Sequence, residues 1–192
     1  MNTYTFHVSL PGTRRVWRKI EMSADQTLED LHFAIQDAYE WDADHLYSFF
    51  MSGKAWDEST EYCLPEGADP WGVPLDDEEF EEPLAPELDE EQRANALQLL
   101  AEQLGIPPEV SETLLATLVD PYAGPGDVRT TTIESLGLTP GQEFMYLFDY
   151  GDEWRFKVRV HAINEDADPE AEYPRLVESV GEAPEQYPDW DE

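Results

Sequence analysis

The sequence predicts an α+β fold, in which one long helix crosses a β-grasp-like mixed sheet that also carries a helical insertion. Two hairpin patterns and one amphipathic segment support this prediction. Residues 144–160 contain a strand with large apolar side chains on both faces, a turn, and a strand that alternates between apolar and polar types, and residues 3–22 contain two alternating strands joined by a turn. Residues 27–39 keep apolar side chains at helical spacing. Strands that surround a single helix in this order are typical of a sheet with the helix packed across it.

The N-terminal hairpin joins residues 3–10 and 14–22 through a turn at Pro11-Gly12. Every second residue of the first strand is apolar, so we expect one buried face. The apolar side of the second strand also contains Arg18, which conflicts with a simple amphipathic pattern.

The helix is expected to begin after Thr27, whose side chain can cap it with Asp30 as its partner in a capping box. Its apolar stripe consists of Leu28, Leu31, Ile35, Ala38 and Tyr39. His32 lies within this stripe. Residues 46–51 then predict a third strand.

The central hairpin consists of residues 144–148 and 154–160. Its first strand has large apolar side chains on both faces, so we expect both faces to be covered. Its second strand alternates, and the positions predicted to be buried are Trp154, Phe156, Val158 and Val160. Residues 149–152 turn the chain, because Gly151 permits positive φ and the two aspartates can accept backbone N–H bonds.

We predict a single domain over residues 1–192 with an insertion at residues 56–125. The insertion begins as an acidic, proline-rich loop, and its apolar stripes at about 87–120 predict a pair of helices. The other predicted elements are a short helical turn at 132–138, a type II turn at 139–142, a last strand within 173–180 and a frayed acidic tail at 182–192.

The composition is strongly acidic, with 44 Asp and Glu against 11 Lys and Arg and a net charge of −33. Such a surface repels nucleic-acid phosphate and anionic lipid, so we expect neither direct nucleic-acid binding nor membrane binding. A salt-rich cytoplasm and a mesophilic protein with acidic loops both fit this charge. Because Cys63 is the single cysteine, no intramolecular disulfide can form. The chain has no signal-peptide pattern and no apolar run of membrane-spanning length, which favours a cytoplasmic location.

Three stretches together resemble the plasmid pRiA4b ORF-3-like family. They are residues 16–19, residues 27–36 running on to Trp41 and His45-Leu46, and residues 149–154. The resemblance implies an α+β domain without an established biochemical activity, and some members of the family accompany mobile elements. This chain departs from the family pattern at Phe156, where a His is usual, and in residues 177–188, where many members have paired cysteines. A metal or catalytic role built on those residues is therefore not implied here.

One candidate site is a small polar cleft beside the central hairpin, formed by His32, His45, Asp149, Asp152 and Trp154. The alternative is structural: His32 and His45 would be hydrogen-bonded residues at element boundaries, and the two aspartates would hold the turn. No pair of these residues has the spacing of metal ligands, and Cys63 is expected to be a packed thiol. We assign no catalytic residue, metal or cofactor.

The second candidate is a basic docking face for an acidic protein partner. Its residues are Arg14, Arg15, Arg18, Lys19, Arg155, Lys157 and Arg159. The alternative is that these cations form cross-strand pairs with internal acids such as Glu21 and Glu153.

The leading hypothesis is a non-enzymatic cytoplasmic binding or protein-interaction module. The sequence has no phosphate-binding glycine loop, nucleophile elbow or HExxH motif, which counts against familiar enzyme classes. Two alternatives stay open. One is a hydrolase-like enzyme with Asp149, Asp152 and His32 around a cleft, and the other is an accessory protein associated with mobile DNA. The sequence does not indicate an oligomeric state.

Overall fold

The computed structural model describes residues 1–12, 15–65, 126–168 and 170–187. The chain divides into two compact units, Met1–Val73 with Pro125–Glu192 and Pro74–Gly124, and all described residues lie in the first. The predicted helical pair lies outside the described residues. None of the helices in the described ranges is long and apolar enough to cross a membrane.

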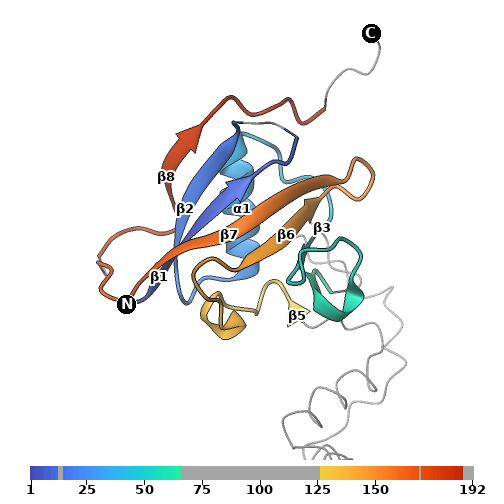
Figure 1. The fold of residues 1–192 in the computed structure, drawn as a ribbon. Coiled ribbons are helices and arrows are strands. Elements are labelled where there is room, and N and C mark those ends of the chain that lie inside the picture. Colours follow the sequence, from blue (N-terminus) through green and yellow to red (C-terminus); the bar gives the residue numbers. More distant parts are fainter. Residues whose placement is uncertain (13–14, 66–125, 169, 188–192) are drawn as a thin grey trace, which may run out of the picture. The chain divides into compact units, whose positions relative to one another are not determined.

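The described residues form a mixed α+β unit in which eight strands make one sheet (Figure 1). The strand order is β5-β4-β3-β6-β7-β1-β2-β8, and every pairing is antiparallel except that of β4 with β5. The strands are β1 Thr3–Ser9, β2 Trp17–Ser23, β3 Tyr47–Phe50, β4 Glu61–Cys63, β5 Gly126–Asp127, β6 Glu143–Phe148, β7 Trp154–Asn164 and β8 Arg175–Val180. The helices are α1 Leu28–Tyr39 and the 3-10 turns η1 Glu58–Thr60 and η2 Glu134–Leu136. The α+β class is confirmed, and the β-grasp-like arrangement stays a prediction.

Helix α1 begins with the predicted capping box. The Asp30 N–H donates to Thr27 Oγ1 over 3.2 Å, and the Thr27 N–H donates to Asp30 Oδ2 over 2.8 Å. The helix ends at Glu40, which has a left-handed φ of 60° and donates its N–H to the last turn. These caps fix both ends of the helix, so its apolar stripe faces one side of the sheet.

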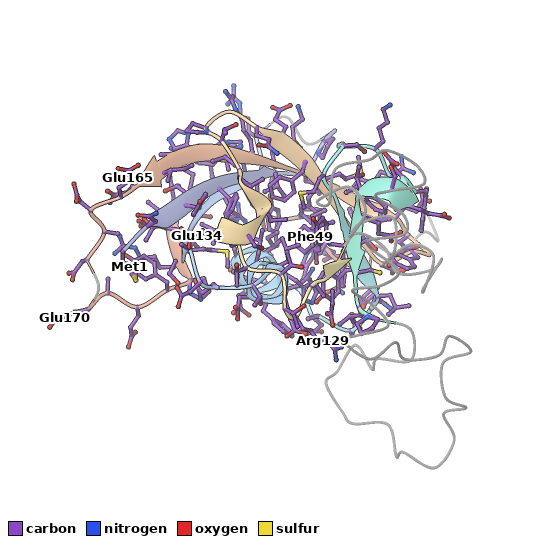
Figure 2. All side chains as sticks on the ribbon, turned by 90° about the horizontal axis from the view of Figure 1, so that it is seen from below. Met1, Phe49, Arg129, Glu134, Glu165 and Glu170 are labelled. Carbon is purple, nitrogen blue, oxygen red and sulfur yellow. The ribbon has the colours of Figure 1, made fainter. Side chains whose placement is uncertain are left out.

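The core lies between that stripe and the helix-facing side chains of the sheet (Figures 1 and 2). Phe49, labelled in Figure 2, is fully buried within it. The predicted alternation of β7 is confirmed, because Phe156 is 1% exposed while Arg155 and Lys157 on either side of it are exposed. The opposite face of the sheet, which α1 does not cover, therefore carries the polar side chains of β7.

Two short strands differ from the sequence prediction. β4 lies inside the segment predicted as an acidic loop, and it pairs with β3 from Ser48 opposite Cys63 to Phe50 opposite Glu61. β5 pairs with β4 in parallel. Strands of three and two residues are too short to show a period of two, so no alternation marks them. The predicted type II turn is confirmed, since Gly141 has φ 88° and the Gln142 N–H donates to the Thr139 carbonyl over 3.0 Å.

Candidate functional site

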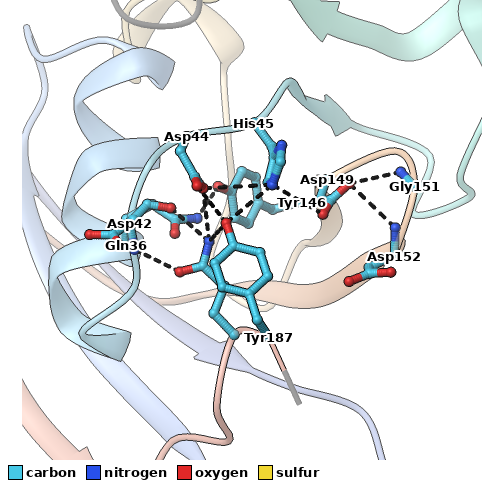
Figure 3. A network of polar contacts seen from close by, with 10 residues as sticks. Gln36, Asp42, Asp44, His45, Tyr146, Asp149, Gly151, Asp152 and Tyr187 are labelled. Carbon is cyan, nitrogen blue, oxygen red and sulfur yellow. Dashed lines mark hydrogen bonds and ion pairs between the residues drawn. The ribbon is translucent and has the colours of Figure 1, made fainter. Parts of the chain in front are cut away.

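A polar cluster gathers where the α1–β3 loop, the β6–β7 turn and the C-terminal segment meet (Figure 3). His45 Nε2 lies 3.5 Å from Asp149 Oδ2 and 3.1 Å from the Tyr187 hydroxyl. That hydroxyl also donates to Asp44 Oδ2 over 2.5 Å. We call Asp44, His45, Asp149 and Tyr187 the His45 cluster. It joins three segments that are distant in sequence, and two of its members, His45 and Asp149, belong to the predicted cleft.

Asp149 serves the turn and the cluster with different oxygens. Its Oδ1 accepts the N–H groups of Gly151 over 2.8 Å and Asp152 over 3.3 Å, so the predicted turn-holding role of this carboxylate is confirmed. Its Oδ2 faces His45. Asp152 is exposed, and its backbone N–H rather than its carboxylate takes part in these contacts.

His32 lies in the core, apart from the His45 cluster. It is 1% exposed, and its ring stacks on Tyr47 with 3.6 Å between ring centroids. The Tyr146 hydroxyl accepts a bond from Gln36 Nε2 over 2.7 Å, so its own proton points to His32 Nδ1, 2.6 Å away. Burial lowers the pKa of His32 to about 3. His32 is therefore a neutral imidazole protonated on Nε2, in agreement with the structural alternative.

Trp154 is partly buried and packs on Trp41, with 4.7 Å between ring centroids. Trp41 in turn donates from Nε1 to the Pro184 carbonyl over 2.9 Å. Trp154 thus supports the end of the sheet at which the C-terminal segment binds. The structure does not bring His32 and Asp152 together with Asp149 around one cleft, as the hydrolase alternative requires.

The part of the chain that the structure describes contains no group of three or more His, Cys, Asp or Glu arranged to hold a metal ion. Burial, followed by the nearby Glu61 and Asp127 carboxylates, raises the pKa of the Cys63 thiol to about 11. This supports the prediction of an inert, packed thiol.

The second candidate site is the sheet face opposite α1, which we call the open face. It carries Lys19 from β2 and Arg155, Lys157 and Arg159 from β7. Strand β1 lies between β2 and β7, and its His7 pairs with Lys19 on one side and with Arg159 on the other.

Three of these cations have acidic neighbours. Lys19 Nζ lies 2.9 Å from Glu178, Lys157 Nζ lies 2.8 Å from Glu143, and Arg155 Nη2 lies 2.6 Å from Glu153. The predicted cross-strand pairing with internal acids is thus confirmed for Lys19 and Lys157, whereas Arg155 pairs with Glu153 two positions before it in the chain.

Arg159 has no acidic partner within ion-pair distance among residues 1–12, 15–65, 126–168 and 170–187. Burial lowers the pKa of His7, and the charges of Lys19 and Arg159 lower it further. Lys19, His7 and Arg159 thus lie side by side on the open face, and Glu143 lies opposite Arg159 in the β6–β7 register.

Arg18 does not belong to this face, which corrects the predicted docking set. It is 4% exposed and lies on the helix side of β2, as its place in the alternation indicates. Arg14 lies outside the described residues, and Arg15 is exposed in the turn before β2. Glu21, expected to pair within the basic strands, binds Arg175 of β8 over 2.6 Å.

The family model described as plasmid pRiA4b ORF-3-like protein matches residues 2–187. The chain belongs to this family. No curated protein matches it. Among solved structures, it is similar to the protein of unknown function MM3350 from Methanosarcina mazei Go1, with 21% identity and a TM-score of 0.51 over 93% of this chain and 69% of that one. This likeness concerns the fold alone.

For this member of the plasmid pRiA4b ORF-3-like family, the predicted departure at Phe156 has a structural counterpart. Its ring lies edge-on to Tyr39 at 4.9 Å and to Trp41 at 5.4 Å between centroids. The position fills the core here and offers no imidazole to a site.

Sequence reasoning missed the contribution of the C-terminal segment. Residues 182–187 were expected to fray, but Gln186 is 7% exposed and forms two bonds with the Asp42 backbone, of 2.7 and 2.9 Å. Gln186 and Tyr187 have no periodic neighbours, so no pattern marks them. The one feature of the sequence that could have indicated an ordered segment is the presence of an aromatic and an amide side chain within an otherwise acidic tail.

Proposed function

We propose that this protein is a non-enzymatic cytoplasmic interaction module that binds an acidic protein segment on its open face. The observation that carries the proposal is the row of Lys19, His7 and Arg159 across three neighbouring strands in a chain of net charge −33. Cations in so acidic a protein are scarce, and this row places them on a face that α1 leaves uncovered (Figure 1).

The spacing of the row suits an extended polypeptide. Neighbouring strands lie about 4.8 Å apart, so Lys19 and Arg159 stand roughly 10 Å from each other with His7 between them. Trp17 contributes an apolar contact beside this row, with its ring 4.8 Å from that of His7. A segment that crosses the strands can therefore place carboxylates on both cations and a side chain on Trp17.

The existing ion pairs do not block such a partner. Lys19–Glu178 and Lys157–Glu143 are exposed surface pairs, and pairs of this kind contribute only about 0–1 kcal/mol to stability. A partner carboxylate can replace Glu178 or Glu143 at little cost, and Arg159 has no pair to lose among the described residues.

The net charge gives this binding a characteristic salt dependence. At about 0.01 M salt the Debye length is about 30 Å, so all acids of the chain repel an acidic ligand. Near 0.15 M salt the Debye length falls to about 8 Å, so the distant acids are screened and the nearby cations of the open face dominate the interaction with the ligand. At 1 M it is about 3 Å and the local attraction is also weakened. We therefore expect affinity to pass through a maximum at intermediate salt.

The test is a fluorescence-anisotropy titration of a labelled hexaglutamate peptide against wild type, the double variant Lys157→Glu/Arg159→Glu and the control Lys54→Glu/Arg129→Glu. The control makes the same change in net charge at two residues outside the predicted docking set. We expect the first variant to lose at least tenfold in affinity at 0.15 M salt and the control to lose less than twofold. Equal losses would contradict a local site. Preferential retention of a 20-base-pair duplex DNA by the wild type would favour the mobile-DNA alternative instead.

A further inference from the structure

A groove lies on the helix side of the sheet, between the end of α1 and the C-terminal segment 179–187. Its volume of about 550 Å³ lies within the range of small-molecule sites, which is about 300–1,000 Å³. The residues that matter for its chemistry are Arg18, Glu40, Asp42, Glu182 and Glu185. This groove is separate from the open face, because Arg18 lies on the other side of β2 from Lys19.

The groove contains a buried guanidinium group. Arg18 is 4% exposed and donates from Nε to the Ala38 carbonyl over 2.7 Å. Its Nη1 donates to the carbonyls of Trp17 at 3.0 Å, Val180 at 3.0 Å and Gly181 at 3.2 Å. Its Cζ lies 4.7 Å from the centre of the Tyr39 ring.

The remaining nitrogen, Nη2, has no hydrogen-bond partner among the residues that the structure describes. Within the same residues no carboxylate lies at ion-pair distance from Arg18. A buried charge is costly unless it is paired. Four carbonyl bonds and the C-terminal end of α1 stabilise the charge of Arg18. Nη2 is not among the fully buried polar atoms that lack a partner in the described part of the chain, so it reaches the groove, where a ligand oxygen can contact it. Because Nε and Nη1 are occupied by carbonyls, a carboxylate can accept charge-assisted bonds from Nη2 alone.

The rim of the groove has the opposite charge. Glu40, Asp42, Glu182 and Glu185 line it, and none of them pairs with Arg18. A purely anionic ligand meets repulsion at this rim, and a purely cationic ligand leaves the guanidinium unpaired. Both requirements are met by a molecule that carries a carboxylate and one or more amines a few ångströms away.

We propose that this groove binds a small zwitterion, with its carboxylate on Arg18 and its amines toward the acidic rim. Two sources have this chemistry: a free basic amino acid, and the C-terminal end of a lysine- or arginine-rich peptide. The volume accommodates either an amino acid or the last few residues of a peptide.

The first experiment changes only the ligand. The probes are L-lysine, the peptide acetyl-Gly-Lys-Lys with a free carboxylate, and the same peptide as its C-terminal amide. The indole N–H resonance of Trp41 reports binding, because this group donates to Pro184 in the groove wall. We expect the free-acid peptide to shift this resonance in a saturable titration and the amide to bind at least tenfold more weakly. A comparable response to L-lysine would show that a free amino acid is enough to fill the groove. A response to the free-acid peptide without a response to L-lysine would identify the C-terminal end of a peptide as the ligand. Equal binding of acid and amide, or no saturable shift with any probe, overturns the proposal.

The second experiment tests the rim with the bonds of Arg18 kept in place. Glu182→Gln/Glu185→Gln removes two rim charges, and the control Glu170→Gln/Glu172→Gln removes two exposed charges that do not line the groove. We expect the rim variant to bind the free-acid peptide at least fivefold more weakly than the wild type, and the control to bind it with an affinity within twofold of the wild type. Equal effects of the two variants overturn the cationic half of the proposal.

Discussion

At the scale of single residues, Arg18 shows how one position can satisfy two patterns. It lies on the apolar side of β2 and also among clustered basic residues. In the structure its side chain lies on the helix side of the sheet, as the strand alternation predicts. Its guanidinium connects β2, α1 and β8 through carbonyl oxygens. Basic residues that are close in sequence therefore do not share one sheet face when the alternation of the strand places their side chains on opposite faces.

Replacing Arg18 with Met tests this structural role. The change leaves the carbonyls of Ala38, Val180 and Gly181 without their donor, and a buried unsatisfied polar group costs about 1–3 kcal/mol. We expect a loss of roughly 2–4 kcal/mol in the free energy of unfolding by urea denaturation. Lys19→Met, one residue away on the open face, should stay within about 0.5 kcal/mol of wild type. Similar losses for the two variants would contradict the assignment of faces.

Trp154 provides a second residue-scale test. Truncation of a buried Trp to Ala costs about 3–5 kcal/mol, and because this ring is partly buried we expect about 3 kcal/mol. Its Nε1 is buried and has no hydrogen-bond partner within the described part of the chain, so Trp154→Phe removes an unsatisfied donor and should cost less than half as much. Chemical denaturation of both variants gives the comparison. A Trp154→Ala protein with the wild-type midpoint would show that the ring does not anchor the sheet.

His32 links residue chemistry to pH. Its pKa of about 3 in the folded protein lies below the ordinary value of 6.5, so the unfolded chain binds the proton more readily. The contribution of this group to stability is complete above pH 6.5, and it falls by about 1.4 kcal/mol per pH unit between pH 6.5 and 3. We expect the imidazole carbon resonances of His32 to show no titration from pH 7.5 to 4.5. A titration midpoint near 6.5 would contradict the buried hydrogen-bonded tautomer.

At the scale of elements, the predictable parts are those with long periodic patterns. The alternation of β1, β2 and β7, the two covered faces of β6 and the capped stripe of α1 were predicted from sequence and are confirmed. β4 and β5 are too short to carry a period. The contact of His45 with Asp149 depends on a loop and a turn more than 100 positions apart in the chain, and their shared position at one end of the sheet is visible only after the strand order is known.

The C-terminal segment is the element whose role the sequence least indicates, and Gln186 is the residue that holds it. Gln186→Ala removes the two bonds to the Asp42 backbone and a third to Asp44 Oδ1. We expect amide hydrogens of residues 181–187 to exchange at least tenfold faster, while those of β1 and β7 stay unchanged. Gln142→Ala, in a surface turn, is the matched control. Unchanged exchange in 181–187 would mean that other contacts hold the segment.

At the scale of the whole molecule, a net charge of −33 makes the compact state repel itself. Salt screens this repulsion, because the Debye length falls from about 30 Å at 0.01 M to about 3 Å at 1 M. We expect a higher thermal unfolding midpoint in 1 M KCl than in 10 mM KCl. An equal or lower midpoint would show that local ion pairs offset the global repulsion.

Replacing the predicted insertion with a linker tests which residues the folded unit requires. The sequence predicts an insertion at residues 56–125, but β4 within this range pairs with β3, so the segment that a linker can replace is shorter. Replacing residues 66–125 with a flexible eight-residue linker should leave a cooperatively folding domain, because β4 and β5 are neighbouring strands about 4.8 Å apart. Replacing 56–125 should be more destabilising. Loss of cooperative unfolding in the shorter replacement would place residues 66–125 in the core.

The proposed function depends most on the open face as a docking surface for an acidic segment. The direct measurement is a ¹H–¹⁵N NMR titration of the full chain with hexaglutamate at 0.15 M salt, with the pKa of His7 followed in the same samples. We predict that shifts are confined to open-face residues of β2, β1 and β7, and that the pKa of His7 rises as the ligand neutralises Lys19 and Arg159. Shifts centred elsewhere, or a pKa of His7 that does not change at saturation, would contradict the proposed function.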